Sequence, residues 1–141
     1  MILAFDPGIT TGWAGYHGDH YGCGQIDSKS LLNVYGFISE ARPDVIVYED
    51  FKHRPQLITA ELYSIQLIGT FRLWSELHGF PEPTAILPAK AKAFWTDDKL
   101  KALSLWHPGK PHAMDATRIL LTHRASTEKE WLDQTLRTIR G

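Results

Sequence analysis

Three acidic residues stand at the ends of predicted secondary-structure elements, where the sites of α/β proteins usually assemble. Asp6 follows a first strand, Glu49 follows a fourth strand, and Asp115 lies in the first turn of a late helix. Mg²⁺ takes oxygen ligands and usually needs only a few protein carboxylates, because water and substrate phosphate complete its shell. Two such ions about 3.5–4 Å apart can activate an attacking water and stabilise the leaving oxygen of a phosphodiester. The three acids fit that chemistry if the fold brings them together.

Each acid taken alone also has a purely structural explanation. Asp6-Pro7-Gly8 is a favourable turn sequence, and a carboxylate such as Asp115 stabilises a helix N-terminus electrostatically. Glu49 has a rival in Asp50, but alternation along a strand turns the two side chains to opposite faces. Only one of these two is therefore expected to face a shared site.

His112 precedes Asp115 by three residues, so both are expected to project from one face of the same helix. An imidazole at that position can bind a metal ion, or it can act as a general acid or base. A surface or capping histidine is the structural alternative. The spacing makes His112 a fourth candidate for the site.

The elements that must position these residues follow from the hydrophobic pattern. Short apolar segments predict strands at residues 1–5, 11–16, 21–26, 45–48 and 83–87. Longer amphipathic patterns predict helices at residues 28–41, 56–78, 99–106, 111–123 and 127–140. This order predicts an α/β fold with a mixed five-stranded sheet, in which three antiparallel strands precede the parallel ones, flanked by helices.

Length and composition are those of a globular protein. The 141 residues suit a single domain over residues 1–141, and 43% apolar residues can build its core. No apolar run approaches the roughly 20 residues that cross a bilayer, so we expect a cytoplasmic protein without a membrane partner. The lone cysteine, Cys23, is expected to be a buried small hydrophobe in a reducing compartment.

The charge distribution is uneven along the chain. The net charge is −1, but residues 1–51 carry two basic and seven acidic side chains, hence −5, and the remainder of the chain carries +4. A protein that uses acids at a metal site and bases on a phosphate-binding surface has this pattern. Chance asymmetry gives the same pattern, so charge alone does not choose between these functions.

Four sequence blocks together resemble one family. Ile2–Ala14, with its Asp-Pro-Gly turn, resembles the opening of RuvC-like Holliday-junction resolvases, which have the RNase H-like fold. Val45–Phe51 resembles their second acid followed by an aromatic residue. Pro88–Lys92, with Asp98-Lys99 after it, resembles their basic segment, and His112–Ala116 resembles their closing helix. The blocks occur in the family's order over about residues 1–124.

The resemblance implies a metal-dependent endodeoxyribonuclease that hydrolyses paired strands of four-way DNA junctions. Its catalytic and metal-site residues would be Asp6, Glu49, His112 and Asp115. It implies Mg²⁺ as cofactor, with Mn²⁺ as a substitute and two ions per site. The DNA-binding residues would be Phe51, Lys52, Arg54, Lys90, Lys92 and Lys99. Phe51 would stack on an unpaired base, or it is a plain core residue.

The chain departs from the bacterial pattern in two respects. It is shorter than typical bacterial members and resembles the compact bacteriophage-encoded forms, which would place it in the cytoplasm of a bacterial host. Residues 51–55 differ from the bacterial pattern near the expected DNA surface, so forks and flaps are also expected substrates. Two other functions stay open, a non-catalytic branched-DNA-binding module and a nucleotide-binding lobe of an actin-like ATPase.

The long helix predicted at residues 56–78 has apolar residues around more of its circumference than one sheet contact can cover. A homodimer would bury the surplus, and its two-fold symmetry would match that of a four-way junction. The alternative is a monomer in which the final helix, residues 127–140, covers the second face.

Overall fold

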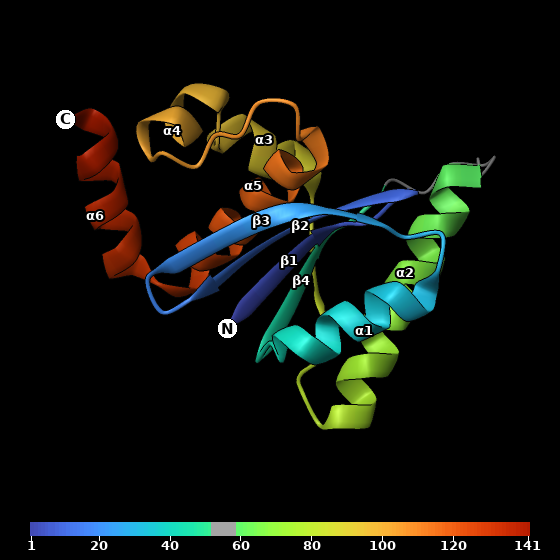
Figure 1. Cartoon of the computed structure of the whole chain (residues 1–141). Coiled ribbons are helices and arrows are strands. Elements are labelled where there is room, and N and C mark those ends of the chain that lie inside the picture. Colours follow the sequence, from blue (N-terminus) through green and yellow to red (C-terminus); the bar gives the residue numbers. More distant parts are fainter. Residues whose placement is uncertain (52–58) are drawn as a thin grey trace.

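The computed structural model describes residues 1–51 and 59–141. The described residues form a five-stranded sheet in the order β3-β2-β1-β4-β5, with helices on both faces (Figure 1). The strands are β1 (Ile2–Asp6), β2 (Thr10–His17), β3 (His20–Asp27), β4 (Val45–Glu49) and β5 (Thr84–Ile86). β1, β2 and β3 are antiparallel, while β4 and β5 join parallel to β1 and to each other. The predicted mixed sheet is confirmed.

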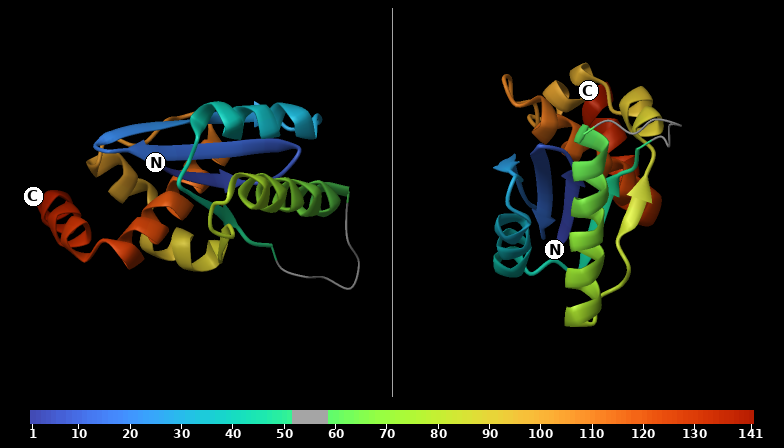
Figure 2. Two further views of the ribbon diagram at one scale, coloured as in Figure 1. Left: turned by 90° about the horizontal axis from the view of Figure 1, so that it is seen from below. Right: turned by 90° about the vertical axis from the view of Figure 1, so that its right-hand side faces the viewer.

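The six helices of the described chain fall into two groups. They are α1 (Leu31–Ala41), α2 (Thr59–His78), α3 (Pro88–Phe94), α4 (Asp97–Ala102), α5 (Pro111–Thr127) and α6 (Lys129–Arg140). α1 and α2 cover one face of the sheet, and α5 lies on the other with α3, α4 and α6 around it (Figures 1 and 2). No helix within these described residues is both long and apolar enough to cross a membrane.

β1 and β4 are apolar up to the acids that end them, because both faces of these central strands are covered by helices. Leu3 and Phe5 of β1 pack under α1 and α2, while Ala4 between them packs under α5. β4 alternates in the same way, with Ile46 on the first face and Val47 on the second. Large side chains therefore fill the α1–α2 side, and small ones let α5 lie close to the sheet.

Three sequence predictions need correction. The short helix expected at residues 99–106 is α4, which begins earlier because the Thr96 side chain accepts a hydrogen bond from the backbone N–H of Lys99 and caps it. α3 was not predicted as a helix, since a seven-residue element is too short to show helical periodicity. Cys23, expected to be buried, is only half-buried on β3.

Gly12 sets how closely α5 approaches the sheet. It lies opposite Asp6 in the β1–β2 register, and the N-terminus of α5 rests directly on it. A Cβ atom at this position would lie 1.9 Å from the carbonyl oxygen of His112, a distance that no real contact allows. The missing side chain therefore brings the first turns of α5 up to the end of β1.

Gly12→Ala should destabilise the protein by about 3 kcal/mol or more, the upper end of what overpacking costs, because the new methyl group meets backbone rather than a movable side chain. Thermal or urea unfolding measures the change. Gly22→Ala on β3 is the matched control, since its added Cβ would meet only Trp13 ring atoms at 3.6 Å. Equal stability of the two variants would contradict the close approach of α5.

Candidate functional site

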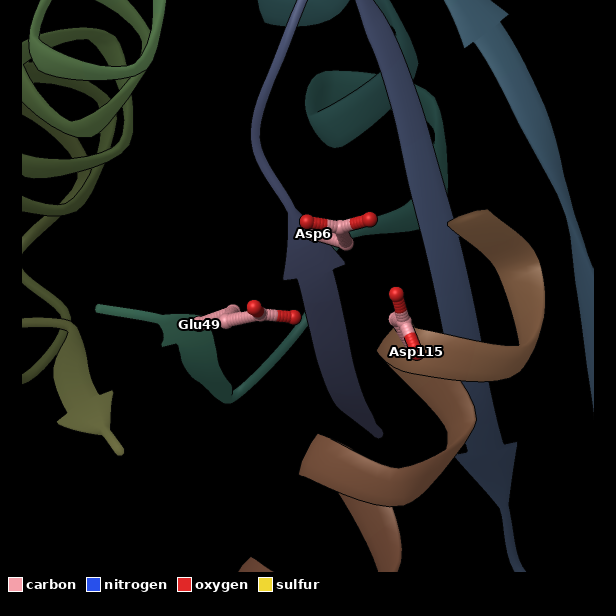
Figure 3. A group of neighbouring side chains, drawn as sticks. All are labelled: Asp6, Glu49 and Asp115. Carbon is pink, nitrogen blue, oxygen red and sulfur yellow. The ribbon is translucent and has the colours of Figure 1, made fainter. Parts of the chain in front are cut away.

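The three candidate carboxylates converge at one end of the sheet. Asp6 is the last residue of β1, Glu49 is the last residue of β4, and Asp115 lies on α5 (Figure 3). One ligand atom from each lies within 4.8 Å of the others. β1 and β4 are parallel and in register, so their carboxyl ends place Asp6 and Glu49 side by side. The three acids therefore lie close enough together to form the shared site that the sequence analysis predicts.

The positions of the individual acids refine the sequence prediction. Glu49 belongs to the cluster and Asp50 does not, in line with the alternation expected of a strand. The Asp50 carboxylate instead accepts a hydrogen bond of 2.9 Å from the backbone N–H of Phe51. Asp115 was expected in the first turn of its helix, but α5 begins at Pro111, so Asp115 lies just beyond that turn.

The turn that follows Asp6 is held by hydroxyl groups on both sides. The Ser64 hydroxyl of α2 donates to the carbonyl oxygen of Pro7 at 2.7 Å. Thr11 Oγ1 donates to Ser28 Oγ at 2.8 Å, and Ser28 Oγ lies 2.7 Å from the carbonyl oxygen of Ile9. These contacts fix the chain where it leaves β1, so the Asp6 carboxylate has a defined position.

His112 contacts Asp6 directly. Its Nδ1 lies 2.9 Å from Asp6 Oδ2, a distance at which the ring N–H donates to the carboxylate. Its backbone N–H donates to Gln25 Oε1 at 3.2 Å, which ties the start of α5 to β3. The prediction that His112 and Asp115 share a face is confirmed, since both reach Asp6. The histidine side chain is half-exposed and lies at the border of the carboxylate cluster.

The predicted DNA-binding residues have different surroundings. Lys92 of α3 reaches the site, with its Nζ 3.3 Å from Asp115 Oδ2, while Lys90 is exposed on the same helix. Lys99 contacts Phe94 instead, donating to its carbonyl oxygen at 2.7 Å and lying over its ring. Phe51 is half-buried after the end of β4. Lys52 and Arg54 lie outside the described residues.

Arg118 is a residue of the site that the sequence analysis missed. Its Nη1 lies 3.0 Å from Asp115 Oδ1, and its side chain is almost fully buried. The sequence does indicate that Arg118 lies near the site, because it follows Asp115 by three residues on a predicted helix and the two side chains therefore share a face. Arginine three residues after an acid is also an ordinary surface pair, so the spacing alone did not mark it.

Burial and crowding raise the proton affinity of Glu49 and Asp6. Burial raises the pKa of Glu49 from its ordinary 4.5 to about 7, and the negative charge of Asp6 adds to the rise. Burial also raises the pKa of Asp6, although the hydrogen bond from His112 opposes the change. Lys92 favours the charged form of both acids. A bound cation would favour ionisation further, because it supplies positive charge where the three carboxylates meet.

The donor set fits a hard divalent cation. All three candidate ligands are carboxylates, the type that Mg²⁺ and Mn²⁺ prefer, and no thiolate takes part. Three converging carboxylates at the end of a sheet can therefore hold metal ions and leave coordination positions for water and a phosphate.

Comparison with solved structures shows that the chain has the RNase H-like fold of RuvC. Thermus thermophilus RuvC in complex with a Holliday-junction substrate superposes with a TM-score of 0.67 at 17% identity, over 90% of this chain and 95% of that one. The fowlpox virus resolvase, solved with substrate Holliday-junction DNA, gives 0.52 at 14% identity, over 90% and 98%. The yeast mitochondrial Holliday-junction resolvase Ydc2 gives 0.52 at 14% identity, over 84% and 75%.

Sequence comparison finds no relative of this kind. No family model matches the chain, and no curated protein matches it. The similarity to bacterial, viral and mitochondrial resolvases is therefore structural, at low identity. It establishes the fold and leaves the activity to be proposed from the site.

Glu49→Gln should stabilise the metal-free protein at high pH. Because the folded-state pKa of Glu49 is raised, the folded protein binds a proton that the unfolded chain has released between about pH 4.5 and 7, and wild-type stability falls as the pH rises through this window. Glutamine removes the effect. At pH 8 in a chelator, we expect a gain of about 1–2 kcal/mol, allowing for partial exposure.

Thermal unfolding at pH 5 and pH 8 measures this difference, with Asp50→Asn as the control from outside the cluster. Added Mg²⁺ should raise the melting temperature of the wild type at pH 8 more than that of Glu49→Gln, because the variant has lost a ligand. A variant that is less stable than the wild type at pH 8 in chelator would contradict the crowding of these carboxylates.

Proposed function

We propose that the chain is a metal-dependent, structure-selective endodeoxyribonuclease that resolves four-way (Holliday) DNA junctions and other branched DNA such as forks and flaps. Residues 1–141 would form one RuvC-type nuclease domain. The observation that carries the proposal is the convergence of Asp6, Glu49 and Asp115 at the end of the sheet. The fold supports it, since two similar structures hold Holliday-junction DNA. A compact bacteriophage-type enzyme would work in the cytoplasm of a bacterial host.

Mg²⁺, with Mn²⁺ as a substitute and two ions per site, would supply a water of lowered pKa and stabilise the leaving oxygen of the phosphodiester. Asp6, Glu49 and Asp115 hold the site, and their charges are already partly balanced by Lys92 and Arg118. His112 orients the Asp6 carboxylate through Nδ1. Its Nε2 then serves either to hold a proton for the reaction or to bind metal. The expected products carry 5′-phosphate and 3′-hydroxyl ends.

The proposed DNA-binding surface surrounds the site. Lys92 already lies against Asp115, so a backbone phosphate drawn to the carboxylate end of the sheet would meet its ammonium group. Lys90 and Lys99 on α3 and α4 extend the basic surface, and Lys52 and Arg54 would add to it. Phe51, half-buried beyond Glu49, would stack on an unpaired base.

We propose a homodimer through α2. α1 packs against one side of this helix, while four of its described apolar side chains are exposed, namely Leu62, Ile65, Leu73 and Leu77. The alternative cover, α6, packs against α5 and α4 on the far side of the molecule (Figure 1). α6 therefore does not cover the exposed face of α2, as the monomer alternative requires. A two-fold axis through α2 would give each of two paired strands its own active site.

Substitution of the acids tests the proposed activity. Asp6→Asn, Glu49→Gln and Asp115→Asn should each lower cutting of a labelled four-way junction to background, because each removes a metal ligand. Junction binding in a gel-shift assay should remain within about a few-fold, since the fold does not require the charge. Forked and linear DNA in the same assay, with and without Mg²⁺, define the preferred structure.

Asp50→Asn, one residue from Glu49 and outside the cluster, is the matched control and should cut like the wild type. A wild-type protein that binds junctions without cutting them in Mg²⁺ would be a non-catalytic binding module. ATP binding without junction binding would instead identify a nucleotide-binding lobe. Near wild-type cutting by any of the three acid variants removes that acid from the metal site.

Disruption of the exposed face of α2 tests the dimer. The wild type should sediment at micromolar concentration as twice its 16.0 kDa chain mass, and Leu73→Glu with Leu77→Glu should give the single-chain mass, because the charges cannot be buried in an apolar interface. Leu32→Glu at an exposed position of α1 is the matched control and should stay dimeric. A wild type of single-chain mass refutes the dimer.

A further inference from the structure

Arg118 is a buried cation beside the carboxylate cluster. It lies on α5 three residues after Asp115, and only a tenth of its side chain is exposed. Its guanidinium group has three different acceptors: Asp115 Oδ1 at 3.0 Å, the carbonyl oxygen of Trp95 at 2.8 Å, and the Asp97 carboxylate. A planar group with several donors in a fixed arrangement loses its freedom to rotate when three acceptors hold it.

The two oxygens of Asp115 have different partners. Oδ1 is bound by the buried Arg118, whereas Oδ2 faces Lys92, whose side chain is half-exposed. A half-exposed lysine can move into solvent at little cost. If Arg118 left its acceptors, buried polar groups would lose their hydrogen-bond partners. A cation that enters the cluster can therefore replace Lys92 at Oδ2, while Oδ1 stays with Arg118.

Arg118 also joins the basic segment to the site. Trp95 lies between α3 and α4, and Asp97 begins α4, so the same guanidinium group contacts both ends of the connection that follows Lys92. The buried Arg118 side chain therefore contacts both the Asp115 carboxylate and the segment that follows Lys92.

We propose that Arg118 is a positioning residue of the metal site. It fixes the Asp115 carboxylate so that Oδ2 is presented to the metal, and it holds the α3–α4 segment against α5. This inference rests on the proposed metal-dependent function. Partners that orient a metal ligand from outside the coordination shell commonly change metal affinity or activity by about 10–100-fold when they are substituted.

The charge of Arg118 and its geometry act on a metal ion in opposite directions. Loss of a positive charge beside the cluster would by itself attract a cation more strongly, while loss of the orienting contacts would weaken its binding. Arg118→Lys separates the two, because lysine keeps the charge but its single ammonium group cannot reproduce the planar, three-way contact. We therefore expect weaker metal binding from Arg118→Lys.

The experiment measures Mn²⁺ binding to the purified protein without DNA by titration calorimetry. The Kd for Mn²⁺ should rise about 10-fold or more in Arg118→Lys, and the Mg²⁺ concentration for half-maximal junction cutting should rise with it. Arg124→Lys is the matched control. The Arg124 side chain is equally buried on α5, but it pairs with Glu128 and lies over the Tyr16 ring, away from the cluster of Asp6, Glu49 and Asp115. Its Kd should stay within about twofold of the wild type.

A double-mutant cycle tests whether Arg118 acts through Asp115. In the Asp115→Asn background, Arg118→Lys should lower Mn²⁺ affinity little further, because the carboxylate that it orients is gone. A full, additive loss in that background would overturn the proposal. So would a wild-type Kd for Arg118→Lys, or an equal loss in Arg124→Lys, which would indicate general destabilisation.

If circular dichroism shows that Arg118→Lys is unfolded, Asp97→Ala takes its place, because it removes one of the three acceptors at a half-exposed position. Weaker Mn²⁺ binding by this folded variant supports the proposal, and wild-type binding overturns it. The proposed function fails separately: a wild type that neither binds Mn²⁺ nor cuts junctions refutes both. A wild type that does both, with Arg118→Lys equal to it, refutes only the role of Arg118.

Discussion

The close contact between Gly12 of β2 and the backbone of His112 on α5 is the constraint on which the site depends. β1 and β4 bring Asp6 and Glu49 together through strand pairing alone, but Asp115 comes from a helix that must cross the sheet at the right depth. A helix normally packs on a sheet at a distance set by its side chains. Here one position without a side chain lets the backbone itself meet the sheet, and the third carboxylate then reaches the other two.

The residue types of the central strands also allow α5 to lie close to the sheet. Large residues such as Phe5 fill the space under α1 and α2, while Ala4 and Ala14 leave room on the side of α5. α5 thus lies closer to the sheet than α1 and α2 do. The candidate site forms on this side, because groups on α5 lie within hydrogen-bond distance of groups on β1, as the contact between His112 and Asp6 shows.

Holding three carboxylates together works against stability, and the protein balances the charge from two directions. Arg118 acts from the interior, and Lys92 acts from the surface. The interior cation is permanent, whereas the surface cation can be replaced. A site of this kind stays assembled when no metal is bound and still has room for positive charge to enter.

Much of this arrangement could be predicted from the sequence, because apolar segments alternate clearly with turns and two of the three acids end strands. The mixed sheet and the long helices followed from periodicity and from the order of the elements. Strand alternation indicated only that one of Glu49 and Asp50 faces the site, and the family resemblance pointed to Glu49. α3 could not be predicted, because seven residues are too few to show a period. The roles of Arg118 and Gly12 depend on tertiary contacts across 21 and 100 residues of chain, which no local pattern reports.

The three acids are spread over most of the chain, at positions 6, 49 and 115. No short fragment contains the cluster, and a chain emerging from the ribosome has two acids but not the third until α5 has been made. Pairing over such long stretches is slow compared with local helix formation, since the entropy of closing the loops must be overcome first. Assembly of the cluster therefore needs contacts across most of the chain, and a chain that still lacks α5 cannot form it.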